Sequence, residues 1–242
     1  DVEQIELGRH ELVEFLYHED DEIQRRAAVT LALLGAIAHE SFDDVFHRLS
    51  KQMSMMSAEW MGEMDAPASP LRTANYGARV RPFEVNGKLR ESYLHVILSM
   101  GPAAVESLSQ TLESADRTER LVALFVLRHM GRAAASARAA LFNAARSHDV
   151  VERAWAVRAL SAVAEDAVST AEQLVRLYGE ELRTAWPGDF ISTSQSGRMT
   201  DVFAEALHEL GAPIVPYLTK LLDDPDMALR LLAMRALRPN LD

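Results

Sequence analysis

The chain has 242 residues, of which 48% are hydrophobic, and it contains no cysteine. This length and apolar content allow one domain with a sizeable core, and the lack of cysteine excludes disulfide frameworks, thiolate catalysis and cysteine-ligated zinc. The formal net charge of -11 argues against nucleic acid as the default partner, because phosphate binding is driven mainly by cationic side chains.

The charge is distributed unevenly along the chain. Residues 1–65 carry 15 acidic and 5 basic residues, residues 66–160 carry 8 and 13, and residues 161–242 carry 13 and 7. A basic middle section between acidic ends favours a binding function. No run of about 18 apolar residues exists, so we expect no membrane span. The lack of cysteine fits the cytosol and the periplasm equally, and we favour the cytosol.

Helical apolar spacing and glycines at helix ends predict pairs of helices in chain order. Gly35, Gly101, Gly131 and Gly211 mark such ends. Counting them predicts about six units, over residues 1–35, 36–101, 102–131, 132–164, 165–211 and 212–242.

A four-residue pattern recurs where the second helix of a unit should begin. Asp is followed by Arg four residues later, then by Ala after three more and Leu after another four. The three occurrences are Asp116, Arg120, Ala123 and Leu127; Asp149, Arg153, Ala156 and Leu160; and Asp226, Arg230, Ala233 and Leu237. We expect the Asp to cap the helix and to bond turn amides or a neighbouring Arg. In the first unit the best match is Asp21 and Arg25, one residue out of register.

The pattern and its spacing resemble the HEAT-like repeats, in the branch that includes the bilin-lyase-type repeats. The resemblance covers nearly the whole chain, residues 1–242. It implies an all-helical, right-handed α-α superhelix of about six hairpins in a single domain, with the second helices lining a concave face. Stacking would bury an apolar stripe that a single hairpin cannot bury alone.

The recurring register also predicts which side chains face the core and which face the concavity. Counting from the Arg as zero, positions 3, 4, 7 and 10 are apolar and should form the core, while positions 1, 5 and 8 should line the concave face. That face comprises Glu91, His95, Leu98, Leu121, Phe125, Arg128, Ala154, Arg158, Ser161, Asp201, Glu205, His208, Leu231, Arg235 and Arg238. Phe125, Arg128 and Arg158 at its centre suit an acidic or amphipathic peptide.

Two units carry long insertions between their helices. The first, residues 59–87, separates helices expected over 41–58 and 88–100, and the second is residues 183–198. Aromatic residues and arginines, which are enriched at protein interfaces, occur in both: Trp60, Arg72, Tyr76, Arg79, Arg81 and Phe83 in the first, and Trp186 and Phe190 in the second. We interpret both as partner-binding loops; the alternative is that they are flexible or cover apolar surface.

Catalytic alternatives rest on weaker patterns. The pairs His10-Glu11, His18-Glu19, His39-Glu40 and His208-Glu209 are similar to the iron-binding pairs of deoxyhypusine hydroxylases, which are HEAT-like enzymes. Their positions do not follow the repeat spacing, so we expect no metal site. His39 with His47 lacks a third placed ligand, and Glu205 with His208 is more simply a surface hydrogen bond than an acid/base pair.

Together these patterns predict a non-catalytic protein-interaction scaffold without cofactor or metal, whose partner is a protein or peptide, with an acidic one favoured. The alternatives are a bilin-lyase-like or other HEAT-fold enzyme or chaperone subunit, and a nucleic-acid-binding protein like the HEAT-like DNA glycosylases. Glu91, Asp201 and Glu205 on the proposed concave face oppose the last alternative, because they would repel phosphate.

Overall fold

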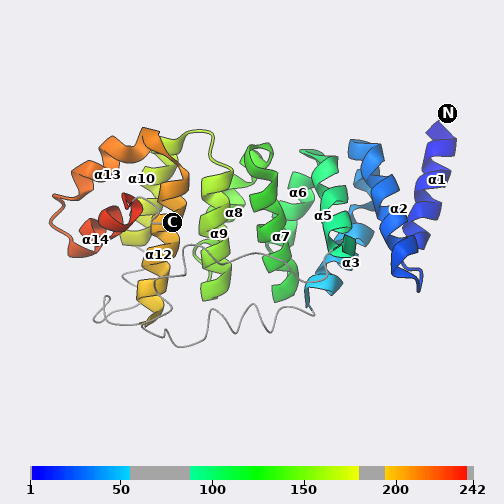
Figure 1. Cartoon of the computed structure of the whole chain (residues 1–242), viewed down its shortest axis with the longest axis horizontal. Coiled ribbons are helices and arrows are strands. Elements are labelled where there is room, and N and C mark those ends of the chain that lie inside the picture. The colour runs from blue at the N-terminus through cyan, green and yellow to red at the C-terminus, as the bar shows by residue number, and fades with distance from the viewer. Residues whose placement is uncertain (1, 55–87, 180–193, 239–242) are drawn as a thin grey trace. The chain divides into compact units, whose positions relative to one another are not determined.

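The computed structural model of the chain describes residues 2–54, 88–179 and 194–238. Within these ranges all regular structure is helical (Figure 1). The predicted all-α class is therefore confirmed.

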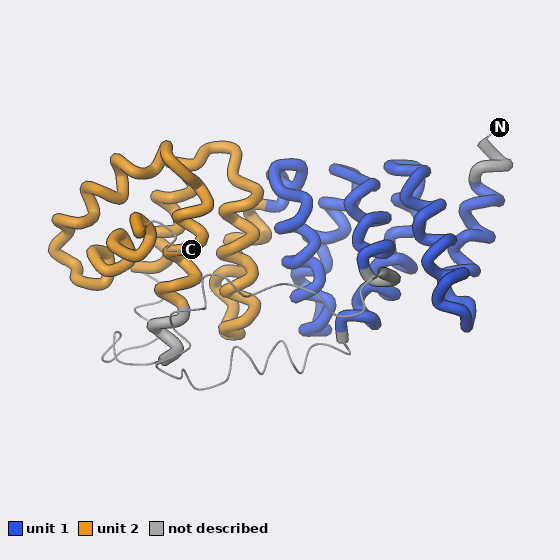
Figure 2. The backbone as a smooth tube through the Cα atoms, in the orientation of Figure 1, with its two compact units in different colours: residues 1–65, 81–137 blue, residues 66–80, 138–242 orange. Residues whose placement is uncertain are grey.

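The chain divides into two compact units (Figure 2). Unit 1 comprises residues 1–65 and 81–137, and unit 2 comprises residues 66–80 and 138–242. The prediction of a single domain over residues 1–242 stays a prediction.

Unit 1 contains three successive helix pairs in its described residues. Its elements are α1 (Val2–Phe15), α2 (Asp21–Leu34), the 3-10 helix η1 (Gly35–Ser41), α3 (Phe42–Ser54), α5 (Lys88–Met100), α6 (Ala103–Thr111), α7 (Arg117–Met130) and η2 (Gly131–Ala137). The helices pair as α1 with α2, α3 with α5 and α6 with α7, and α5 also packs against α2 and α7. Leu31, Leu49, Ile97 and Leu127 are fully buried between them.

Unit 2 follows the same order of packing. Its described elements are α8 (Arg138–Ala144), α9 (Val150–Ala162), α10 (Ala167–Leu177), α12 (Ser194–Glu209), η4 (Ala212–Ile214), α13 (Val215–Leu221) and α14 (Met227–Ala236). The pairs are α8 with α9, α10 with α12 and α13 with α14, and α12 also packs against α9 and α14. Leu141, Leu174 and Phe203 lie in this core.

The predicted helix ends are confirmed at all four glycines. Gly35, Gly101, Gly131 and Gly211 have φ values of 56°, 59°, 56° and 77°. A side chain with a Cβ is disfavoured at such values, so glycine ends the helix and lets the chain turn toward the next one.

Four turns share one set of hydrogen bonds, which we call the Asp turn. In each, an Asp with φ between -88° and -77° and ψ between 114° and 118° caps the helix, and its carboxylate accepts from the amide two residues later. Four residues after the Asp, a long polar side chain donates to the backbone carbonyl two residues before the Asp. These donors are Arg120 to Ser114, Arg153 to Ser147, Arg230 to Asp224, and Gln24 to His18.

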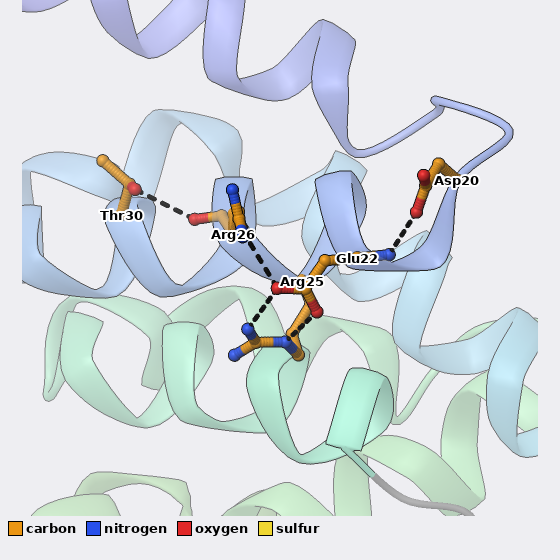
Figure 3. A network of polar contacts seen from close by, with 5 residues as sticks. All are labelled: Asp20, Glu22, Arg25, Arg26 and Thr30. Carbon is orange, nitrogen blue, oxygen red and sulfur yellow. Dashed lines mark hydrogen bonds and ion pairs between the residues drawn. The ribbon is translucent and has the colours of Figure 1, made fainter.

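The first Asp turn corrects the predicted register. Its cap is Asp20 and its donor is Gln24, whereas the sequence pattern indicated Asp21 and Arg25. The pattern required Arg, but the amide of Gln24 supplies the same donor at 2.5 Å from the His18 carbonyl oxygen. Arg25 instead pairs with Glu22 on the surface of α2 (Figure 3).

The helix ends beside the two insertions can also be compared with the predictions. Helix α5 begins at residue 88 as predicted, while the first helix of that pair is described only to Ser54 and residues 55–58 lie outside the described residues. Helix α12 begins at Ser194, so the second insertion, predicted to reach residue 198, is too long by at least five residues. The stretch Ser194–Arg198 has the polar, glycine-containing composition of a loop, yet it is helical because a helix end tolerates such residues.

Candidate protein-binding surface

Most of the predicted contact residues belong to the two insertions and lie outside the described residues. These are Trp60, Arg72, Tyr76, Arg79, Arg81, Phe83, Trp186 and Phe190. Their role stays a prediction.

The predicted concave face is not exposed at its centre. Phe125 is 2% exposed and Arg158 is 9% exposed, while Arg128 is partly exposed. Every residue of α7 from Leu121 to Leu127 is buried, and so is every residue of α9 from Val151 to Ser161. The expectation of an open stripe is therefore wrong at Leu121, Phe125, Ala154, Arg158 and Ser161. A helix buried around its whole circumference has no solvent-facing side for such a stripe.

In unit 2 the corresponding side chains instead join α9, α12 and α14. The Arg158 guanidinium lies 3.1 Å from the Glu205 carboxylate and 5.8 Å from the centre of the Trp155 ring. Ser161 donates to Glu209 at 2.7 Å, and Arg235 of α14 donates to Asp201 of α12 at 2.5 Å. We call this group the inter-helix ion row.

Burial governs the electrostatics of the inter-helix ion row. Desolvation raises the pKa of Glu205, and the neighbouring Arg158 opposes that rise without cancelling it. Desolvation likewise raises the pKa of Asp201 against the lowering effect of Arg235. Because Arg158 and Arg235 already have carboxylate partners, their charge is balanced within unit 2. The acidic peptide expected at this face loses its main electrostatic support.

The histidine patterns do not converge on a metal site. The four His-Glu pairs lie on α1, the first Asp turn, η1 and the end of α12. His208 bonds the Ala236 carbonyl oxygen through Nδ1 at 3.1 Å, and the Nε2 atom of His39 lies 3.5 Å from the hydroxyl of Ser107. Within residues 2–54, 88–179 and 194–238, no three His, Asp or Glu side chains gather in a group that could hold a metal ion.

Exposed apolar side chains are a feature that the sequence reasoning missed. On the exposed side of α2, Val29 is 41% exposed and Leu33 is 83% exposed, and Ile37 in η1 is 55% exposed. We call these three residues the outer apolar set. Ala28 and Leu31 on the packed side of α2 are fully buried. The signal available was the spacing of four between residues 29 and 33, off the face that carries Ala28 and Leu31.

A helix that crosses a bilayer must be both long and apolar. In the described part of the chain, no helix combines the length and the apolar character needed to cross a bilayer.

Comparison with known proteins gives no family. No protein-family model matches the chain, and no curated protein matches it. Five solved chains match. One is an engineered protein whose crystal structure comes from the Northeast Structural Genomics Consortium, with 19% sequence identity over 95% of this chain and 94% of that chain, and a TM-score of 0.35. A similarity of that size supports neither a shared fold nor a shared function.

Proposed function

We propose that this chain is a non-catalytic protein-interaction module, built as a HEAT-like right-handed solenoid of about six helical hairpins. The Asp turns and the successive helix pairs support the solenoid, because repeated hairpins that pack on their neighbours in sequence are the unit of such folds. Solenoid folds serve many functions, so a particular surface of this chain must account for protein binding.

The outer apolar set supports the proposal most directly. Leu33, at 83% exposure, leaves most of its side chain in water, with Val29 one turn before it on the same helix. Covering these side chains with a partner would remove apolar area from water, which favours a contact at this position. We place the contact on the exposed side of α2 and on η1, with residues 59–87 and 183–193 as further contact segments.

Three charged side chains of α2 that precede the outer apolar set pair with one another. Arg26 lies one turn before Thr30 on α2, and its guanidinium pairs with Glu22, which also pairs with Arg25 (Figure 3). These two arginines hold the pKa of Glu22 at about 2, so the carboxylate stays charged at neutral pH. The partner segment therefore needs apolar side chains that cover Leu33 more than it needs a particular charge.

Substituting Leu33 by Glu tests this surface. Because Leu33 is exposed, Leu33→Glu should leave the thermal midpoint unchanged while it weakens partner binding by roughly tenfold or more, the usual effect of losing an apolar anchor. The measurement is quantitative affinity capture from native lysate with the full chain, together with a thermal melt of each variant.

Val168→Glu is the matched control, since it places the same charge at an exposed apolar position of α10 in unit 2. Proteins retained by the native chain and by Val168→Glu but lost with Leu33→Glu would support the proposal. Equal retention by all three would remove the outer apolar set from it, and replacing residues 62–87 by a short Gly-Ser turn would then test the first insertion.

A further inference from the structure

Helix α14 differs at one position from the other three helices that begin at an Asp turn. Four residues after the Arg or Gln of that turn stand Ala28, Leu124 and Val157, which are at most 1% exposed. The same position in α14 is Met234, which is 52% exposed. The sequence register predicted a core residue here, so Met234 corrects that prediction.

The open position is part of a whole face of α14. Met227, seven residues earlier and therefore on the same side of the helix, is 57% exposed, and Leu231 between them is partly exposed. In α9 the equivalent residues Ala154 and Val157 are fully buried, and α12 packs along that helix. Among the described residues, this side of α14 therefore has the apolar character of a packing surface and yet is exposed.

The charge of α14 restricts what can cover this face. Residues 227–238 contain Arg230, Arg235 and Arg238 and no acidic residue. Arg230 bonds the carbonyls of its own Asp turn and Arg235 pairs with Asp201, so the exposed Arg238 gives this face its positive charge. The face therefore fits an apolar surface that carries carboxylates.

Helix α1 of the same chain presents such a surface. Residues 2–15 contain four acidic residues and one base. Leu7 is 63% exposed and Phe15 is 47% exposed, and the exposed Glu11 and Glu14 lie between them along the helix. Spacings of four, seven and eight residues put all four side chains on one face.

We propose that the chain associates head to tail, with the exposed face of α14 (Met227, Leu231, Met234 and Arg238) on the acidic apolar face of α1 of a second copy. This inference does not rest on the proposed function, since it uses neither the outer apolar set nor the insertions. The two faces differ, so the contact is heterologous and propagates from copy to copy into a ring or an open chain.

Sedimentation velocity of the 242-residue chain over a range of concentrations tests the proposal. The native chain should form species larger than a dimer as its concentration rises, and raised salt should weaken them because the contact pairs opposite charges. Met234→Glu removes one face and Leu7→Glu removes the other, so each variant alone should be monomeric. Both positions are exposed, so a thermal melt should show unchanged folding.

Mixing the two variants gives the decisive result. Each retains the face that the other lacks, so the mixture should form a dimer and nothing larger. A native chain that stays monomeric up to roughly 0.5 mM, where contacts of millimolar affinity are visible, would overturn the proposal. So would association of Leu7→Glu alone, which would indicate a symmetric α14 contact, or a mixture that remains monomeric.

Discussion

Gln24 shows how one residue can keep a local motif and add a role that the motif does not have. Its amide nitrogen donates to the His18 carbonyl oxygen, as arginine does in the three other Asp turns. Its amide oxygen accepts from the hydroxyl of Tyr93 at 2.8 Å and from Arg48 at 2.5 Å. Arginine has no acceptor, so it could not make the second set of bonds.

Replacing Gln24 by Arg should therefore destabilise the protein, although Arg is the commoner residue at this position of the turn. The side chain is 5% exposed, and the change would place a second guanidinium beside Arg48 while leaving the Tyr93 hydroxyl with only the Leu16 carbonyl oxygen at 3.5 Å as acceptor. We expect a loss of about 2–4 kcal/mol in the free energy of unfolding, measured by urea denaturation.

The reverse change, Arg120→Gln, is the control at an equivalent position. Gln can still donate to the Ser114 carbonyl, so we expect a cost of about 1 kcal/mol or less. A Gln24→Arg variant as stable as the native chain would contradict the importance we assign to the acceptor atom.

At the residue scale the sequence was a good guide where bonds are local. Asp116, Asp149 and Asp226 cap their helices as the spacing predicted, because a cap bonds an amide only two residues away. Asp20 was missed because the pattern required a guanidinium rather than a donor of any kind. The bonds of Gln24 to Tyr93 and Arg48 span 69 and 24 residues, and no local pattern encodes them.

At the scale of elements, α9 is the helix whose surroundings the sequence described least well. Its charged residues Glu152, Arg153 and Arg158 would ordinarily mark a solvent face, yet they are 5%, 5% and 9% exposed. Each has a partner that permits burial: the Ser147 hydroxyl donates to Glu152, Arg153 donates to the Ser147 carbonyl, and Arg158 pairs with Glu205. Periodicity assigns faces to a helix, but neighbouring helices decide which faces are covered.

Removing one partner of the ion pair between α9 and α12 should destabilise the protein. Replacing both partners by apolar residues should change its stability much less. Glu205→Leu leaves the Arg158 side chain, only 11% exposed, without its carboxylate, so we expect a loss of about 2–4 kcal/mol. Arg158→Met should cost less, because the Glu205 side chain is 34% exposed and can be hydrated.

The double variant Arg158→Met with Glu205→Leu completes this cycle. Removing both charges avoids the cost of a buried unpaired ion, so its stability in urea should lie within about 1 kcal/mol of the native chain. If the two single losses simply add in the double variant, the pair is not coupled and the inter-helix ion row is not the link that we describe.

At the scale of the whole molecule, each unit buries a tyrosine in its core. Tyr93 in unit 1 and Tyr178 in unit 2 are both 0% exposed, and Tyr178 shares a hydrogen bond of 2.9 Å with Thr200. Burial raises the pKa of both phenols above the ordinary value of 10.0. The folded chain therefore holds these protons at pH values where the unfolded chain releases them, and its stability falls as the pH rises above 10.

Alkaline titration of phenolate absorbance, followed in parallel with helical circular dichroism, measures this effect. Tyr93 and Tyr178 should ionise together with the loss of helix, and Tyr93→Phe or Tyr178→Phe should each remove one late-ionising group. Ionisation of either phenol near pH 10 with the helices intact would contradict its burial.

Some features of the whole molecule could be predicted from the sequence, and others could not. The all-α class and the successive helix pairs were predicted from apolar spacing and from glycines such as Gly131, because both signals lie within about thirty residues of chain. The exposure of Leu33 and Met234 was not predicted, because an apolar residue on a helix gives no indication of whether another helix lies over it.

The Asp turn has a consequence for how such a chain can grow and vary. Its cap and donor bonds close within seven residues, as from Asp149 and Arg153 to the amide of Val151 and the carbonyl of Ser147. A duplicated hairpin would contain every residue that forms its own turn. No change elsewhere in the chain would be needed for that turn to form. Gene segments that encode one hairpin could therefore be duplicated or deleted as units. The remaining condition is that the apolar side chains fit those of the adjoining helices.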